Sequence, residues 1–133
     1  MELLIKVLAA GGIMGILDFL WLGFIAKKLY YGEMGTILLE KPNMAPALAF
    51  YAIYVVGVIL LVVNPALEKD SWLHAFGYGA LLGFVAYATY DLTNLATLKG
   101  FSPKIVAVDL LWGTVLTAVV ATGAFFAVKW LAT

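Results

Sequence analysis

The chain has 133 residues, 65% of them hydrophobic and only 12% charged, and its mean hydropathy of +1.04 excludes an ordinary soluble domain. Eight lysines balance eight acidic residues, which excludes the basic surface that nucleic acid requires, and the absence of cysteine excludes disulfides and thiolate chemistry. We therefore expect one all-α integral membrane domain over residues 1–133, with the lipid bilayer as its main partner.

Four apolar segments follow one another along the chain. A hydrocarbon core of about 30 Å needs roughly 20 apolar residues per spanning helix, so the chain has room for four spans. Charges and helix-ending residues place these spans at approximately residues 3–26, 44–63, 72–98 and 103–131. The sequence thus predicts a bundle of four transmembrane helices.

Start and stop signals set these boundaries. The lysine pair at 27–28 ends the first apolar run, and residues 30–43 are expected to form an interfacial loop that can include a short amphipathic turn. Proline lacks an N–H group, so the Asn-Pro pair at 64–65 is expected to end the second helix. Ser102 followed by Pro103 predicts the N-terminus of the last helix.

Lysine placement predicts the orientation, because the chain contains no arginine. Positively charged residues favour the cytoplasmic side of a membrane. Five of the eight lysines lie in or beside the first and third loops, so we expect these loops in the cytoplasm and both termini outside. The five are Lys27, Lys28, Lys41, Lys99 and Lys104.

Two expected helices carry a face of small residues. Gly11 and Gly15 lie four positions apart on the first, and Gly79 and Gly83 lie four apart on the third. Helix backbones approach closely at such faces in lipid. We therefore expect both faces to pack against other helices, without a prediction of whether the partner helix belongs to the same chain.

Three carboxylates, Asp18, Asp91 and Asp109, lie inside the expected spans. A charged side chain at the centre of a bilayer costs at least about 2.5–3.5 kcal/mol, so these residues should face protein or water. At 1.5 Å per residue, each lies about 9–14 Å from the side of the first and third loops. Their common depth predicts one polar layer within the membrane.

Helical spacing gathers further polar and aromatic residues in that layer. On the third helix, four of them stand at i, i+3, i+4 and i+7, which is one face of a helix. We expect an inward-facing chamber, whereas the alternative is that these groups only form hydrogen bonds between helices. The candidate ligand-binding residues are Asp18, Trp21, Tyr51, Tyr54, Tyr87, Tyr90, Asp91, Asn94, Asp109 and Trp112.

The charge of this chamber indicates the ligand. No lysine or arginine lies at its depth, so the carboxylates are either protonated or neutralised by a cation. A proton, an amine or a hard metal ion would serve, and the metal candidates are Asp18, Asp91 and Asp109. Lys28 or Lys104 could reach inward as a partial partner, and the aromatic residues could form walls for an organic cation or a hydrophobic ligand.

Two segments give the sequence a family resemblance. The run Tyr90-Asp91-Leu92-Thr93-Asn94 and the later Val108-Asp109-Leu110-Leu111-Trp112 resemble the bacterial family called domain of unknown function 2177, and the segments 18–21 and 50–54 also fit. The resemblance covers nearly the whole chain. It implies a small four-helix inner-membrane protein, with the termini in the periplasm in the orientation above, but it implies no activity, cofactor or ligand.

Two functions remain open from the sequence. The first is a carrier or ligand-binding protein whose carboxylates exchange a proton or cation with a small ligand, as a homo-oligomer because four helices enclose little volume. The second is an enzyme, or its accessory subunit, that modifies the fatty acids of membrane lipids with an aspartate as general acid or base. No nucleophile, redox or cofactor motif is recognisable, which favours the first.

Overall fold

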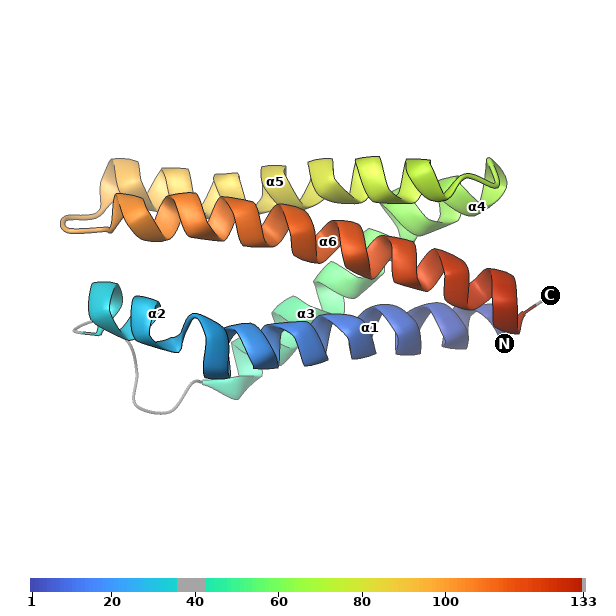
Figure 1. Ribbon diagram of the computed structural model, residues 1–133, viewed down its shortest axis with the longest axis horizontal. Coiled ribbons are helices and arrows are strands. Elements are labelled where there is room, and N and C mark those ends of the chain that lie inside the picture. Colours follow the sequence, from blue (N-terminus) through green and yellow to red (C-terminus); the bar gives the residue numbers. More distant parts are fainter. Residues whose placement is uncertain (36–42, 133) are drawn as a thin grey trace.

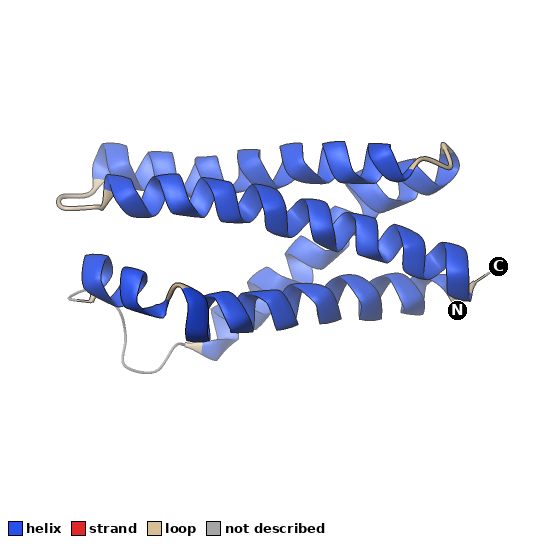
Figure 2. Ribbon diagram, viewed as in Figure 1, coloured by secondary structure: helices blue, strands red, loops and turns tan. Residues whose placement is uncertain are grey.

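The computed structural model describes residues 1–35 and 43–132, and this part of the chain is helical with no strand (Figures 1 and 2). A backbone in lipid must satisfy its own hydrogen bonds, which long apolar runs achieve by forming helices. The elements are α1 (Glu2–Leu20), the π-helical segment η1 (Trp21–Ile25), α2 (Lys27–Met34), α3 (Met44–Val58), the π-helical segment η2 (Ile59–Val63), α4 (Asn64–Glu68), α5 (Trp72–Thr97) and α6 (Pro103–Leu131).

Three continuous helical stretches within the described residues are long and apolar enough to cross a membrane. They are Glu2–Ile25, Met44–Glu68 and Pro103–Leu131. Many of their large apolar side chains are exposed, as are many on α5. Lipid, and not water, is the medium that suits such a surface, so the chain is an all-helical membrane protein.

The helices form two groups (Figure 1). α5 and α6 are antiparallel and lie against each other along their lengths, and α1 packs on α6. α3 runs obliquely past α1 and continues through η2 and α4, which contact α5. Both termini lie at the end of the molecule opposite to α2 and the α5–α6 connection.

The buried core lies where α1, η2 and α6 meet. Met14, Val58, Leu116 and Val120 are almost completely inaccessible there. Aliphatic side chains of this kind interdigitate closely, and removing one typically costs about 2–5 kcal/mol. This core holds α1 and the end of α3 against the middle of α6.

Gly79 and Gly83 allow α5 to pack closely on α6, as the sequence predicted for this glycine face. A Cβ atom added to Gly79 would lie 2.9 Å from the carbonyl oxygen of Thr117. One added to Gly83 would collide with the backbone of Gly113. The corresponding prediction for the glycine face of α1 is not met at Gly15 among the described residues, because a Cβ added there would meet nothing within 4 Å.

The boundaries of α5 and α6 agree with the predicted ones. The Ser102 hydroxyl accepts a hydrogen bond from the Ile105 amide at 3.2 Å, so Ser102 caps the helix as expected. Gly100 adopts a φ of 73° in the connection, a conformation that glycine takes without strain.

The second predicted helix is longer than expected, because the Asn-Pro pair does not end it. The helix continues through Pro65 to Glu68. In the π-helical turn before the proline, the Asn64 amide donates to the Ile59 carbonyl, five residues back. A turn of this kind leaves room for the proline ring, and a helix can pass a proline where such a turn occurs. The Asn64 side chain also accepts a hydrogen bond from Lys6 at 2.5 Å, which ties it to α1.

The expected loop at 30–43 is partly wrong as well. The first helical stretch ends at Ile25, beside the lysine pair, as predicted. After Ala26, however, α2 continues the chain as a helix to Met34, so residues 30–34 are helical. The rest of the predicted loop includes residues 36–42, with Lys41, and lies outside the described residues.

Candidate functional site

Asp18 is a buried carboxylate that joins three helices. The Tyr51 hydroxyl on α3 donates to Asp18 Oδ2 at 2.6 Å, and Trp112 Nε1 on α6 donates to Asp18 Oδ1 at 3.0 Å. The residue is only 7% exposed. Hydrogen bonds to a charged group are stronger than those between neutral groups. Both oxygens of Asp18 are thus engaged in holding α1, α3 and α6 together.

A stacked tryptophan pair lies beside this carboxylate. The rings of Trp21 and Trp112 have centroids 4.4 Å apart and planes 5° from parallel. Trp21 lies at the start of η1, where the Ala26 amide donates to the Trp21 carbonyl at 2.7 Å, a bond that spans five residues. Such π-helical turns often occur at functional sites.

Asp109 is connected to the tryptophan pair through Tyr30. Trp21 Nε1 donates to the Tyr30 hydroxyl at 3.4 Å, and this hydroxyl donates to Asp109 Oδ1. Sequence reasoning missed Tyr30 because it falls in the segment expected to be a loop. The lysine pair that precedes it suggested an ending helix, and only the structure shows that α2 follows and contacts α6.

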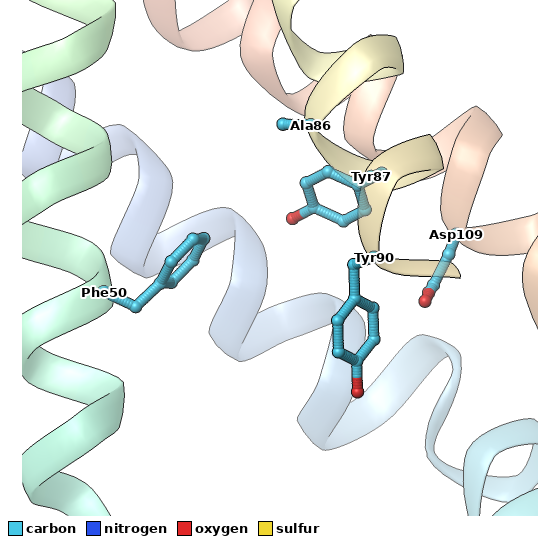
Figure 3. Close-up of a pocket in the computed structure, with 5 residues that line it drawn as sticks. All are labelled: Phe50, Ala86, Tyr87, Tyr90 and Asp109. Atoms are coloured by element: carbon cyan, nitrogen blue, oxygen red, sulfur yellow. The ribbon is translucent and has the colours of Figure 1, made fainter. Parts of the chain in front are cut away.

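A cavity of about 330 Å³ opens beside Asp109. It is lined by Phe50 from α3, Ala86, Tyr87 and Tyr90 from α5, and Asp109 from α6. Figure 3 shows Phe50 extending from the opposite wall, with the Tyr87 hydroxyl pointing toward it. Cavities of roughly 300–1,000 Å³ hold small ligands. The lining is therefore three aromatic rings, one methyl group and one carboxylate.

Gly113 gives Tyr87 its place in this lining. A Cβ atom on Gly113 would overlap the Tyr87 ring, so the absence of a side chain on α6 lets the ring lie flat against that helix. From the opposite wall, Phe50 stacks on Tyr54 with centroids 5.3 Å apart. Tyr54 itself is buried and shares a 2.6 Å hydrogen bond with Thr117, so it supports the wall and does not line the cavity.

Among the described residues, no lysine forms an ion pair with Asp18, Asp91 or Asp109. Within residues 1–35 and 43–132, the two ion pairs are Lys6 with Glu2 at 3.2 Å and Lys129 with Asp70 at 2.6 Å. Lys28 and Lys104, which we considered as partial partners, are exposed. Among the described residues, no side chain donates to the second oxygen of Asp109, Oδ2.

Comparison with known proteins agrees with the membrane character of the fold. The family model of DUF2177, described as "Predicted membrane protein", matches residues 3–126. The chain belongs to this family. No curated protein and no solved structure matches it significantly. The family assignment confirms the resemblance seen in the sequence.

Asp91 of this DUF2177 chain is buried apart from the cavity. It is 0% exposed, and neither of its oxygens has a hydrogen-bond partner in the described part of the chain. It does not line the cavity, although Tyr87 and Tyr90 on the same helix do. Asn94, one turn further along, is half-buried and forms no side-chain hydrogen bond among the described residues.

The ten predicted site residues therefore do not line one chamber in this DUF2177 chain. They form two groups that Tyr30 connects, with three residues beside them. Asp18, Trp21, Tyr51 and Trp112 form the hydrogen-bonded and stacked group; Tyr87, Tyr90 and Asp109 line the cavity; Tyr54 supports it; Asp91 and Asn94 lie outside both. Within the described residues, no group of three acidic, histidine or cysteine side chains is placed to hold a metal ion. Asp18, Asp91 and Asp109 are not gathered into a single cluster.

Proposed function

We propose that this protein is a multi-pass inner-membrane protein that binds a small organic cation in the cavity beside Asp109. The observation that carries the proposal is the lining itself: the aromatic rings of Phe50, Tyr87 and Tyr90 surround a space that also holds one carboxylate. An aromatic face attracts a cation through its quadrupole, with about 2 kcal/mol or more when the contact is desolvated.

The carboxylate supplies the second element of recognition. Oδ2 of Asp109 receives no hydrogen bond from the described residues, while Oδ1 is held by Tyr30. A cationic ligand would contact the unoccupied oxygen and neutralise the charge inside the membrane. Amines and quaternary ammonium ions combine an apolar surface with a positive charge, which matches this lining better than a hydrated metal ion does.

The proposal includes a fourth membrane span, α5. This helix has 26 residues, which at 1.5 Å per residue is about 39 Å and exceeds the hydrocarbon thickness. It lies against α6 along its length, and both termini lie at the same end of the molecule, as an even number of spans requires. The lysine bias supports cytoplasmic connections at α2 and between α5 and α6, with both termini in the periplasm.

Equilibrium binding of radiolabelled choline to the purified protein in detergent micelles tests the proposal. The competitor is the uncharged analogue in which a tert-butyl group replaces the trimethylammonium group. Saturable choline binding that tetramethylammonium displaces and the uncharged analogue does not would support a cation site. Equal displacement by both would show that charge plays no part and would overturn the proposal.

A pair of tyrosine variants on α5 locates the binding. Tyr90 lines the cavity and is 60% exposed, whereas Tyr78 on the same helix is 53% exposed and does not line it. Tyr90→Leu is expected to weaken choline binding about tenfold, because it removes one aromatic face. Tyr78→Leu is the matched control and should leave the affinity unchanged.

A further inference from the structure

A second and larger cavity lies on the other side of α3, as a groove between α1 and α3. Its volume is about 860 Å³, and its lining is apolar except for Asp18, Tyr31 and Tyr51. It extends along α1 and η1 from Val7 to Gly23, which at 1.5 Å per residue is about 24 Å of helix. One leaflet of a bilayer core is about 15 Å deep, so the groove can hold a whole acyl chain.

Glycines create the floor of this groove. Gly11, Gly15 and Gly23 line it, and a Cβ atom at Gly15 would meet nothing within 4 Å. Bulky side chains form its sides: Phe19 is 65% exposed on α1, and Leu48 is 60% exposed on α3. The result is an apolar groove that is open at the surface of the protein, with the backbone of the glycines at its base.

The flanking side chains argue against a second helix as the occupant. Helices that pack on glycines need a flat face of small residues on which backbones come close. Phe19 and Leu22 follow Gly15 by four and seven residues, so both stand on the same face of α1, and both line the groove. A flexible chain of methylene groups fits between such side chains, whereas a helix would be held away from the glycines.

A positive charge lies beside one end of the groove. Tyr31 of α2 lines this end, and Lys27 Nζ lies over the Tyr31 ring at 6.0 Å from its centroid. Lys27 forms no ion pair within the described residues. An apolar groove that ends beside an ammonium group with no ion pair among the described residues is complementary to an amphiphile with an anionic head and an apolar tail.

We propose that the groove between α1 and α3 binds one phospholipid with an anionic headgroup from the surrounding bilayer. Its acyl chain lies over Gly11 and Gly15, and its phosphate lies at Lys27. The site is separate from the cation cavity, because α3 presents Phe50 to one cavity and Tyr51 to the other. The two proposals can therefore fail independently.

Native mass spectrometry of the protein, purified from vesicles of equal phosphatidylglycerol and phosphatidylethanolamine in mild detergent, tests this site. We expect one retained phospholipid per chain, with phosphatidylglycerol preferred. Gly15→Leu places a side chain over the groove floor and should reduce retention about tenfold, because the acyl chain then loses its close contact with the helix backbone. Gly12→Leu is the control, because Gly12 is equally open on α1 but does not line the groove.

A variant that removes the charge of Lys27 distinguishes the contact with the lipid headgroup from the contact with the acyl chain. Lys27→Gln should lower the preference for phosphatidylglycerol about fivefold while a phospholipid is still retained. Lys99→Gln, an exposed lysine in the α5–α6 connection, should not change the preference. Equal retention of lipid by Gly15→Leu and the unmodified protein would overturn the proposal. So would conversion of a dimer to a monomer by Gly15→Leu, because a second copy would then occupy the groove.

Discussion

Trp21 and Trp112 stack face to face, with ring centroids 4.4 Å apart, and each indole nitrogen leads to a different aspartate. Trp112 donates directly to Asp18, whereas Trp21 donates to Tyr30, which in turn donates to Asp109. The pair thus connects the carboxylate at the groove with the carboxylate at the cation cavity. The two carboxylates differ in their hydrogen bonds: both oxygens of Asp18 accept one, whereas only Oδ1 of Asp109 accepts one from the described residues.

The first prediction concerns the Trp112 contact with Asp18. Trp112→Phe keeps an aromatic ring against Trp21 but removes the donor to Asp18 Oδ1. We expect a loss of about 1–3 kcal/mol in the free energy of unfolding, the cost of leaving a buried charged group partly unsatisfied. Unfolding in mixed micelles with increasing dodecyl sulfate measures it. Trp130→Phe, at a position 77% exposed, is the control; an equal loss there would refute the role of the Asp18 contact.

The second prediction compares two glycines. Gly83→Ala should separate α5 from α6, because the new Cβ atom would collide with the Gly113 backbone and lie 2.7 Å from Thr117 Oγ1. The expected cost is about 1–3 kcal/mol of unfolding free energy, the usual range for overpacking. Gly15→Ala meets no atom and should be neutral or slightly stabilising. The same micellar unfolding assay compares the two variants. Equal losses of unfolding free energy would mean that Gly83 is not required for the close packing of α5 on α6.

The third prediction concerns the unpartnered carboxyl of Asp91. A buried polar group without a hydrogen bond typically costs about 1–3 kcal/mol, so its replacement by an apolar side chain should stabilise the fold. We expect Asp91→Val to raise the free energy of unfolding by about that amount, while Asp91→Asn leaves it nearly unchanged. Thermal unfolding in detergent checks this. Destabilisation by both variants would instead indicate a partner for Asp91 that the described residues do not supply.

The fourth prediction tests α5 as a membrane span. Alkaline phosphatase is active only outside the cytoplasm, so fusions report the side of each connection. We expect fusions at Glu33 and Gly100 to be inactive and a fusion at Asp70 to be active. Equal activity at Asp70 and Gly100 would show that α5 does not cross. A full reversal of the three results would keep four spans and change only the orientation.

The sequence predicted the ends of α5 and α6 because short-range chemistry sets them. Ser102 caps its helix through its own hydroxyl, and Gly100 turns the chain with a positive φ. The small-residue face at Gly79 was predicted from spacing alone, and the same spacing on α1 does not bring Gly15 close to another described residue. The extension of α3 past Pro65 was not predictable, because it depends on a π-helical turn and on the Lys6 contact with Asn64, which lies 58 residues away in the sequence.

The candidate site was only partly predictable, because periodicity identifies a face of a helix and not what covers it. Tyr87, Tyr90 and Asp91 share a face by spacing, yet the tyrosines line the cavity and Asp91 is completely buried. Common depth grouped Asp18 with Asp109, but the connection through the tryptophan pair and Tyr30 depends on the contact between α2 and α6.

The most direct test of the proposed cation site is choline binding by Asp109→Asn beside Asp91→Asn. Both variants remove one carboxylate and keep its volume, but only Asp109 lines the cavity. We expect Asp109→Asn to weaken choline binding about tenfold to a hundredfold, as the loss of one charge-assisted contact implies, with an unchanged elution volume in size-exclusion chromatography. Asp91→Asn should bind with the affinity of the unmodified protein. Undiminished binding by Asp109→Asn, or loss confined to Asp91→Asn, would disprove the site.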